Sequence, residues 1–169
     1  PRGINSFKKK NKLNKKKTSV LYFMINKNAS IWKKKFSWER LVNSVEKSLF
    51  DLAKEYSNIK FIFKGKTGVH SDKITQLRSR YKLSNLSFID GGVGHDLINK
   101  ESIIIGFNST AVIESMISGA DVIIPYFKKF RKKPYSEYAH VYNPKLFVNN
   151  EKDLKNKIIQ KFKNNKNYE

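Results

Sequence analysis

The chain has 169 residues, no cysteine and a formal net charge of +21, because 35 Lys and Arg residues stand against 14 Asp and Glu residues. This length suits one domain with a sizeable core, and the lack of cysteine excludes a disulfide framework, a thiolate nucleophile and Cys-ligated zinc. No apolar run approaches the roughly 20 residues that span a bilayer, and the basic N-terminus lacks the apolar stretch of a signal peptide, so we expect a cytoplasmic protein.

Residues 1–17 are polar and dense in lysine, which is typical of a linker or arm. The chain begins with Pro1 rather than Met, so we expect that a part of the protein lies upstream of it. The sequence predicts one folded domain over residues 18–169.

Short apolar runs alternate with segments of helical periodicity along this domain. From Trp38 to Tyr56, apolar side chains recur at three- and four-residue steps, and Ser37 is the candidate N-cap. Ser71 is the candidate cap of the next helix. We predict strands over residues 20–25, 61–63, 86–89, 102–107, 122–124 and 146–148. We predict helical segments over residues 38–56, 71–81, 95–99, 111–117 and 151–162.

This alternation is typical of repeated βαβ units. Right-handed crossovers then make the expected fold an α/β, Rossmann-like domain with a doubly wound, mostly parallel sheet of five to six strands and helices on both faces. Ligands of such sheets bind outside the carboxyl ends of the strands. Three turns that follow predicted strands are therefore candidate binding elements.

The first turn is Lys-Gly-Lys-Thr-Gly, at residues 64–68. A Walker A motif would need a glycine at position 60, which is a lysine, so the P-loop interpretation fails. Two interpretations stay open. Lys64 and Lys66 contact a diphosphate at the end of the strand, or they are solvated lysines of a surface turn.

The second turn contains Gly91, Gly92 and Gly94. It lacks the third glycine of a dinucleotide fingerprint, because that position is Leu97. Three glycines in four residues imply positive φ angles or a close approach of the backbone, and exposed backbone groups suit the edge of a nucleotide base. The adjacent His95 is either a phosphate contact or an uncommitted surface histidine.

The third turn joins a predicted strand to a predicted helix through Asn108, Ser109 and Thr110. A capping hydroxyl, free amide groups and the positive end of the helix dipole together make an anion site. Thr110 and Glu114 are four residues apart and share a helix face, so a phosphate at the cap would leave Glu114 within reach of a ribose. The alternative is an ordinary N-cap with Glu114 in solvent.

Residues 106–125, Gly-Phe-Asn-Ser-Thr-Ala-Val-Ile-Glu-Ser-Met-Ile-Ser-Gly-Ala-Asp-Val-Ile-Ile-Pro, resemble the donor-site signature of GT-B glycosyltransferases, above all those of bacterial capsule and surface-carbohydrate synthesis. The resemblance covers roughly residues 18–162. It implies the carboxyl-terminal, nucleotide-sugar-binding domain of such an enzyme, with the amino-terminal acceptor domain missing. At Asp121 the sequence departs from the Lys-Pro of many relatives, which affects a surface turn.

The resemblance also implies roles for individual residues. Ser109 and Thr110, with Asn108, would bind the donor phosphates, with Lys64 nearby, and Glu114 would bind the ribose. The turn of Asp90, Gly91, Gly92 and Val93 would lie against the base. The catalytic residues are not identified. Enzymes of this family generally need no metal or other cofactor, and the three histidines show no metal-ligand spacing.

The expected partners are a nucleotide sugar, a glycan or lipid-linked acceptor and an anionic membrane face, which would make the protein peripheral at the inner membrane. The charge also favours nucleic acid, through contacts with phosphates. Lysine far outnumbers arginine, however, as an AT-rich coding sequence would produce, so a nucleic-acid-binding module is the alternative rather than the expected function. A nucleotide-sugar epimerase is a second alternative and would need acid/base groups that the sequence does not reveal.

Overall fold

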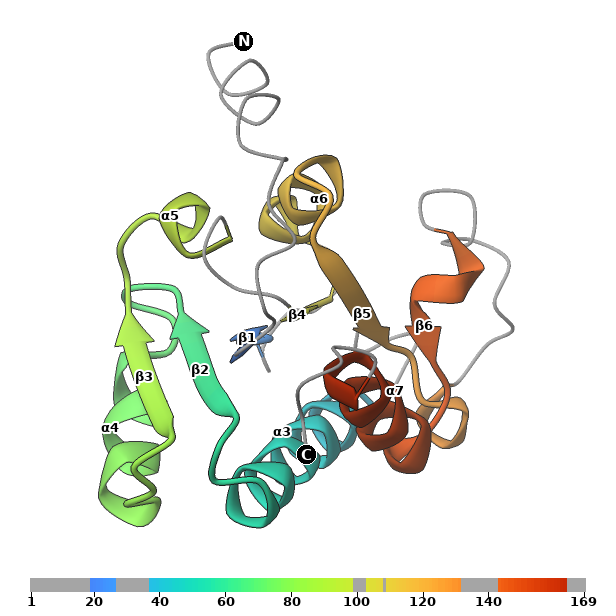
Figure 1. Ribbon diagram of the computed structural model, residues 1–169. Coiled ribbons are helices and arrows are strands. Elements are labelled where there is room, and N and C mark those ends of the chain that lie inside the picture. The colour runs from blue at the N-terminus through green and yellow to red at the C-terminus, as the bar shows by residue number, and fades with distance from the viewer. Residues whose placement is uncertain (1–18, 27–36, 99–102, 108, 132–142, 164–169) are drawn as a thin grey trace, which may run out of the picture.

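The computed structural model describes residues 19–26, 37–98, 103–107, 109–131 and 143–163, without the side chain of His95. Helices and strands alternate along these residues (Figure 1). The strands are β1 (Ser19–Phe23), β2 (Lys60–Gly65), β3 (Leu86–Asp90), β4 (Ile103–Ile105), β5 (Asp121–Pro125) and β6 (Phe147–Val148). The α-helices are α3 (Trp38–Glu55), α4 (Ser71–Arg80), α5 (Gly94–Ile98), α6 (Thr110–Ile117) and α7 (Glu151–Lys163), and two 3₁₀ turns are η1 (Lys128–Phe130) and η2 (Pro144–Leu146).

The six strands form one sheet in the order β3-β2-β1-β4-β5-β6, and every neighbouring pair is parallel. This is the strand order of a doubly wound Rossmann-like sheet, so the predicted fold class is confirmed. The chain runs outward from β1 through β2 to β3, returns to β4 beside β1, and then runs outward to β6. The topological switch point therefore lies between β1 and β4.

Both faces of the sheet are covered, because successive side chains of each strand point to opposite faces. On one face, residues such as Tyr22 and Phe63 pack with buried side chains of α3 and α7. On the other face, Leu21, Ile62 and Ile104 pack with Val112 of α6. The uninterrupted apolar runs in the sequence follow from this double burial.

The structure confirms one of the two predicted helix caps in position. Ser37 is the N-cap residue of α3, although its side chain makes no capping hydrogen bond, and its backbone N–H donates to the carbonyl of Phe130 at 2.8 Å. Ser71 is the first residue of α4 rather than its cap, and His70 occupies the N-cap position. The hydroxyl of Ser71 accepts the N–H of Gly68 at 3.2 Å. The hydroxyl of Ser71 therefore holds the preceding turn rather than the end of the helix.

The edge strand β3 is covered in part by α4, which lies beside it in Figure 1. The Nη2 atom of Arg78 donates to the backbone carbonyl of Phe88 at 2.6 Å. A second contact holds α4 against α3, where Lys73 pairs with the buried carboxylate of Glu46.

Across the described residues, none of the helices combines the length and apolar character needed to cross a membrane.

Candidate functional site

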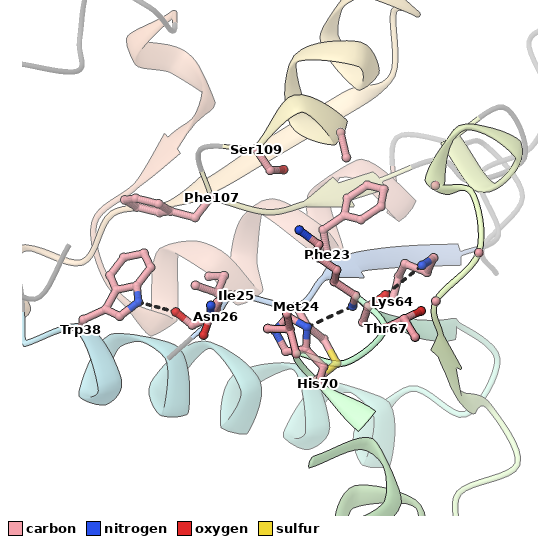
Figure 2. A pocket seen from close by; sticks show the side chains of 17 residues that line it. Phe23, Met24, Ile25, Asn26, Trp38, Lys64, Thr67, His70, Phe107 and Ser109 are labelled. Carbon is pink, nitrogen blue, oxygen red and sulfur yellow. Dashed lines mark hydrogen bonds between the residues drawn. The ribbon is translucent and has the colours of Figure 1, made fainter. Parts of the chain in front are cut away.

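A pocket of about 620 Å³ opens at the carboxyl ends of the strands. Its walls come from the segments that follow β1, β2, β3 and β4, so it lies at the switch point between β1 and β4 (Figure 2). Doubly wound sheets bind their ligands at this place because the loops after neighbouring strands diverge there. Of the residues predicted from the sequence, those that line the pocket are Lys64, Lys66, Gly91, Gly92 and Ser109.

Lys64 supplies a buried positive charge. Only 6% of the residue is exposed, and its Nζ atom donates to the carbonyl of Gly65 at 2.8 Å. Among the described residues, no carboxylate lies within ion-pair distance of this ammonium. Burial holds the pKa of Lys64 below its ordinary value, and the more distant carboxylate of Asp90 acts in the opposite direction. A buried cation without a counter-ion in a pocket wall favours an anionic ligand.

The turn between β2 and α4 carries Lys66 and Thr67 along the pocket wall. Lys66 is exposed, and its backbone N–H donates to Nδ1 of His70 at 3.0 Å. Within the described part of the chain, neither the amide nor the hydroxyl of Thr67 has a hydrogen-bond partner. The turn thus presents an ammonium, a hydroxyl and an amide to the pocket.

The glycine turn after β3 lies against the turn after β2. Gly91 and Gly92 have φ angles of 73° and 74°, which confirms the prediction of positive φ. A Cβ atom at Gly91 would lie 2.0 Å from Oγ1 of Thr67, so the two turns can approach only because this residue is glycine. Asp90 ends β3 with an exposed side chain, and Val93 is 69% exposed. Neither side chain forms part of the pocket wall.

Helix α6 points its N-terminus toward the pocket. Ser109 is the N-cap, and its Oγ atom accepts the N–H of Val112 at 3.4 Å. The N–H groups of Thr110 and Ala111 have no acceptor among the described residues, and Ala111 lines the pocket. The cap predicted from the sequence is therefore confirmed as a feature of the fold, with the positive end of the helix beside the pocket.

The other predicted site residues lie away from these walls or outside the described residues. Thr110 is exposed, and Glu114 is partly buried one turn further along α6. Neither is among the residues that line the pocket. Asn108 and the side chain of His95 lie outside the described part of the structure. In that part, no group of three or more His, Cys, Asp or Glu residues could hold a metal ion.

An aromatic wall was missed by the sequence interpretation. Phe23 is the last residue of β1, Trp38 begins α3 and Phe107 lies two residues after β4, and all three line the pocket (Figure 2). The rings of Trp38 and Phe107 meet edge to face at 4.9 Å, and Trp38 Nε1 donates to the carbonyl of Asn26 at 2.7 Å. The available signal was an aromatic residue near the carboxyl end of each of two predicted strands. The walls of the pocket therefore combine aromatic rings with cationic side chains.

No protein-family model matches the chain, and no curated protein matches it in sequence. The solved structures that resemble it include TarM, with a TM-score of 0.57 and 15% identity, over 91% of this chain and 30% of that one. They also include Thermosulfurimonas dismutans KpsC, described as a beta Kdo 2,4 transferase, with a TM-score of 0.43 and 15% identity, over 69% of this chain and 36% of that one. The chain spans about a third of the length of each, and the likeness to TarM shows a shared Rossmann-like fold.

Proposed function

We propose that the pocket binds a nucleotide sugar and that the chain is the donor-binding part of a glycosyltransferase of the GT-B type. The observation that carries the proposal is the buried ammonium of Lys64, which lines the pocket without a carboxylate partner among the described residues. A phosphate would supply the missing negative charge. The sequence resemblance over residues 106–125 points to the same class of ligand, and the Rossmann-like fold is compatible with it.

The walls suit the parts of such a ligand. The phosphates would lie between Lys64 and the N-terminus of α6, where Ser109 and the free amides are donors. The backbone of Gly91 and Gly92 would meet the base, and Glu114 would accept hydrogen bonds from the ribose at the outer end of the site. None of the described residues that line the pocket is Asp or Glu, so the wall does not repel an anion.

The same groups would assist the transfer step. The bond between the anomeric carbon and the phosphate oxygen breaks while an acceptor hydroxyl forms the new bond to that carbon. The departing nucleoside phosphate gains negative charge, which Lys64 and the dipole of α6 would stabilise. We propose a glycan or lipid-linked acceptor, with the basic surface at an anionic membrane.

Calorimetric titration with UDP, CMP, CDP and GDP tests the donor site. We expect one of these nucleotides to bind the full chain. Lys64→Gln should weaken that binding at least tenfold, because it removes the charge that faces the phosphates. Lys60→Gln is the matched control, since Lys60 lies at the exposed start of the same strand. Equal affinities of the two variants would overturn the phosphate assignment.

Glu114→Ala tests the ribose assignment separately. The variant should keep the fold and bind the same nucleotide several-fold more weakly, because it loses hydrogen bonds to the ribose hydroxyls. Unchanged affinity in this variant, alongside a loss in Lys64→Gln, would remove Glu114 from the site and leave the phosphate assignment in place.

A nucleic-acid-binding function is the second candidate, favoured by the net charge of +21. RNA binding that persists at high salt and is displaced by nucleotide would support it over the donor site. An epimerase is less compatible with the pocket, because acid/base carboxylates are missing from the described residues that line it.

A further inference from the structure

His70 lies at the pocket, between the turn after β2 and the first residue of α4. The residue is 6% exposed, and its Nδ1 atom accepts the backbone N–H of Lys66 at 3.0 Å. The accepting nitrogen carries no proton, so the neutral ring must carry its proton on Nε2. Nε2 is fully buried and has no hydrogen-bond partner among the described residues.

His70 closes the turn formed by residues 66–70. The carbonyl of Lys66 accepts the N–H groups of Val69 at 3.0 Å and of His70 at 3.1 Å, while the N–H of Lys66 is held by the His70 ring. Both backbone polar groups of Lys66 are thus tied to the other end of the turn. Thr67 follows at the tip, where it faces the pocket and touches Gly91.

Gly65 allows the ring to reach this position. A Cβ atom at Gly65 would lie 2.9 Å from Cβ of His70 and 2.5 Å from Cδ1 of Ile74. Both distances are shorter than real Cβ atoms show, and although the end of the Ile74 side chain can rotate away, Cβ of His70 can move only with the backbone of the N-cap, so any other residue would displace His70 from β2. The glycine and the histidine together set the path of the turn.

The surroundings of His70 favour its neutral form. Burial lowers its pKa, and the ammonium of Lys73 acts in the same direction. The backbone of Ile25 and the carboxylate of Asp90 oppose this shift, but the pKa of His70 stays below its ordinary value. The ring is therefore neutral near neutral pH, as the bond from Lys66 requires.

We propose that His70 is a positioning residue of the pocket, whose neutral imidazole holds the turn of residues 66–70 so that Lys66 and Thr67 meet the phosphates of a bound nucleotide. The proposal rests on the proposed function, because it needs a nucleotide in this pocket. In this role His70 acts through the turn, because Nδ1 accepts the N–H of Lys66 and Nε2 is buried.

Two substitutions distinguish the contribution of the accepting Nδ1 atom from that of the rest of the His70 ring. His70→Asn places an amide oxygen near the position of Nδ1, so it can still accept the N–H of Lys66. His70→Gln places its amide further from the backbone, near Nε2, and loses that acceptor. For whichever of UDP, CMP, CDP and GDP binds the wild-type protein, we expect the Asn variant to bind within about twofold of wild type and the Gln variant about tenfold more weakly.

Nuclear magnetic resonance of the ligand-free protein provides an independent readout. The ring nitrogens of His70 should show the form protonated at Nε2. The Lys66 amide should exchange slowly in wild type and in His70→Asn, and faster in His70→Gln, because only the last leaves this N–H without its acceptor.

The outcomes distinguish the two proposals. Equal nucleotide affinity of the wild-type, Asn and Gln proteins overturns the role of His70 and leaves the donor site in place. If no nucleotide binds the wild-type protein, the donor site fails and the role of His70 in ligand binding fails with it. In that case a Lys66 amide that exchanges slowly only in the wild-type and Asn proteins shows that His70 still orders the turn.

Discussion

The buried ammonium of Lys64 costs the ligand-free protein free energy. Removing a charge from water is unfavourable, and a single backbone carbonyl compensates only part of the loss. Its lowered pKa has the same cause, because burial disfavours the charged form. A bound phosphate would remove this penalty, so the residue stores part of the free energy that binding can release.

Lys64→Met should therefore raise the free energy of unfolding of the ligand-free protein by about 1 kcal/mol, while it abolishes nucleotide binding. Chemical denaturation near neutral pH measures the first effect and calorimetry the second.

The stability of the wild-type protein should also depend on pH, in the direction that the lowered pKa of Lys64 sets. A lysine whose folded pKa lies below its ordinary 10.5 makes the folded protein more stable as pH rises through the folded pKa toward 10.5.

The Met variant should lack this contribution at alkaline pH. Lys60→Met, at the exposed start of β2, is the control and should keep it. A Lys64→Met protein that is less stable than wild type at neutral pH would show that the lysine side chain stabilises the fold through its packing rather than destabilising it through its charge.

At the scale of elements, two turns from neighbouring strands form one binding wall. Gly91 and Gly92 have nearly the same positive φ, but their surroundings differ. A Cβ atom at Gly91 would meet Oγ1 of Thr67 at 2.0 Å, whereas one at Gly92 would meet nothing within 4 Å. Alanine substitutions at these two glycines therefore distinguish the loss of stability from backbone strain from the loss caused by a clash between the turns.

We expect Gly92→Ala to lose about 1 kcal/mol of stability from the unfavourable φ alone. Gly91→Ala should lose more, and it should also weaken nucleotide binding because it displaces Thr67. Adding Thr67→Ala should recover most of the difference between the two single variants. Thermal unfolding and calorimetry measure these effects, and equal losses in Gly91→Ala and Gly92→Ala would contradict a direct contact between the turns.

The elements themselves follow largely from local patterns in the sequence. Apolar runs such as Ile103–Ile105 predict strands buried on both faces, and the Asn-Ser-Thr run before α6 predicts a capped helix. The N-cap position of Ser37 was predicted correctly, whereas the cap at Ser71 was wrong by one residue, because the hydroxyl of Ser71 accepts the N–H of Gly68 in the preceding turn. Local patterns cannot weigh such competitors.

The pocket was harder to predict than the fold. Strand ends identify Lys64 and Ser109, because parallel strands bring their carboxyl ends to one edge. Trp38 and Phe107 read as core residues, and their place in a pocket wall depends on how α3 packs beside β4. The role of His70 depends on one hydrogen bond within a turn, which no pattern of residue types reveals.

At the scale of the whole molecule, the net charge and the residues that line the pocket give separate information about the ligand. The longest lysine runs, at residues 8–17 and 33–35, lie outside the described residues, whereas Lys64 and Lys66 line the pocket. The net charge of +21 is thus a poor guide to the ligand, and the location of a few cations is a better one. The parallel sheet places these two lysines in the same pocket as Ser109, although they are far from Ser109 in sequence.

The outer edge of the sheet yields a prediction about association. Arg78→Ala removes the guanidinium that bonds to the Phe88 carbonyl on β3. We expect this variant to self-associate more than wild type, measured by sedimentation velocity over a range of protein concentrations. Arg80→Ala is the control, because it removes the same charge from the same helix while its side chain lies over Tyr81. Equal association of the two variants would contradict a specific effect at the strand edge.

The bond from Arg78 to β3 also bears on the risk of aggregation while the protein is being synthesised. A strand with free carbonyls on one side is a template for another chain, and newly made copies meet before folding is complete. By holding the Phe88 carbonyl, α4 withdraws an acceptor that an incoming strand would need. If Arg78→Ala self-associates as expected, a single side chain of α4 would protect the sheet at the strand where it ends.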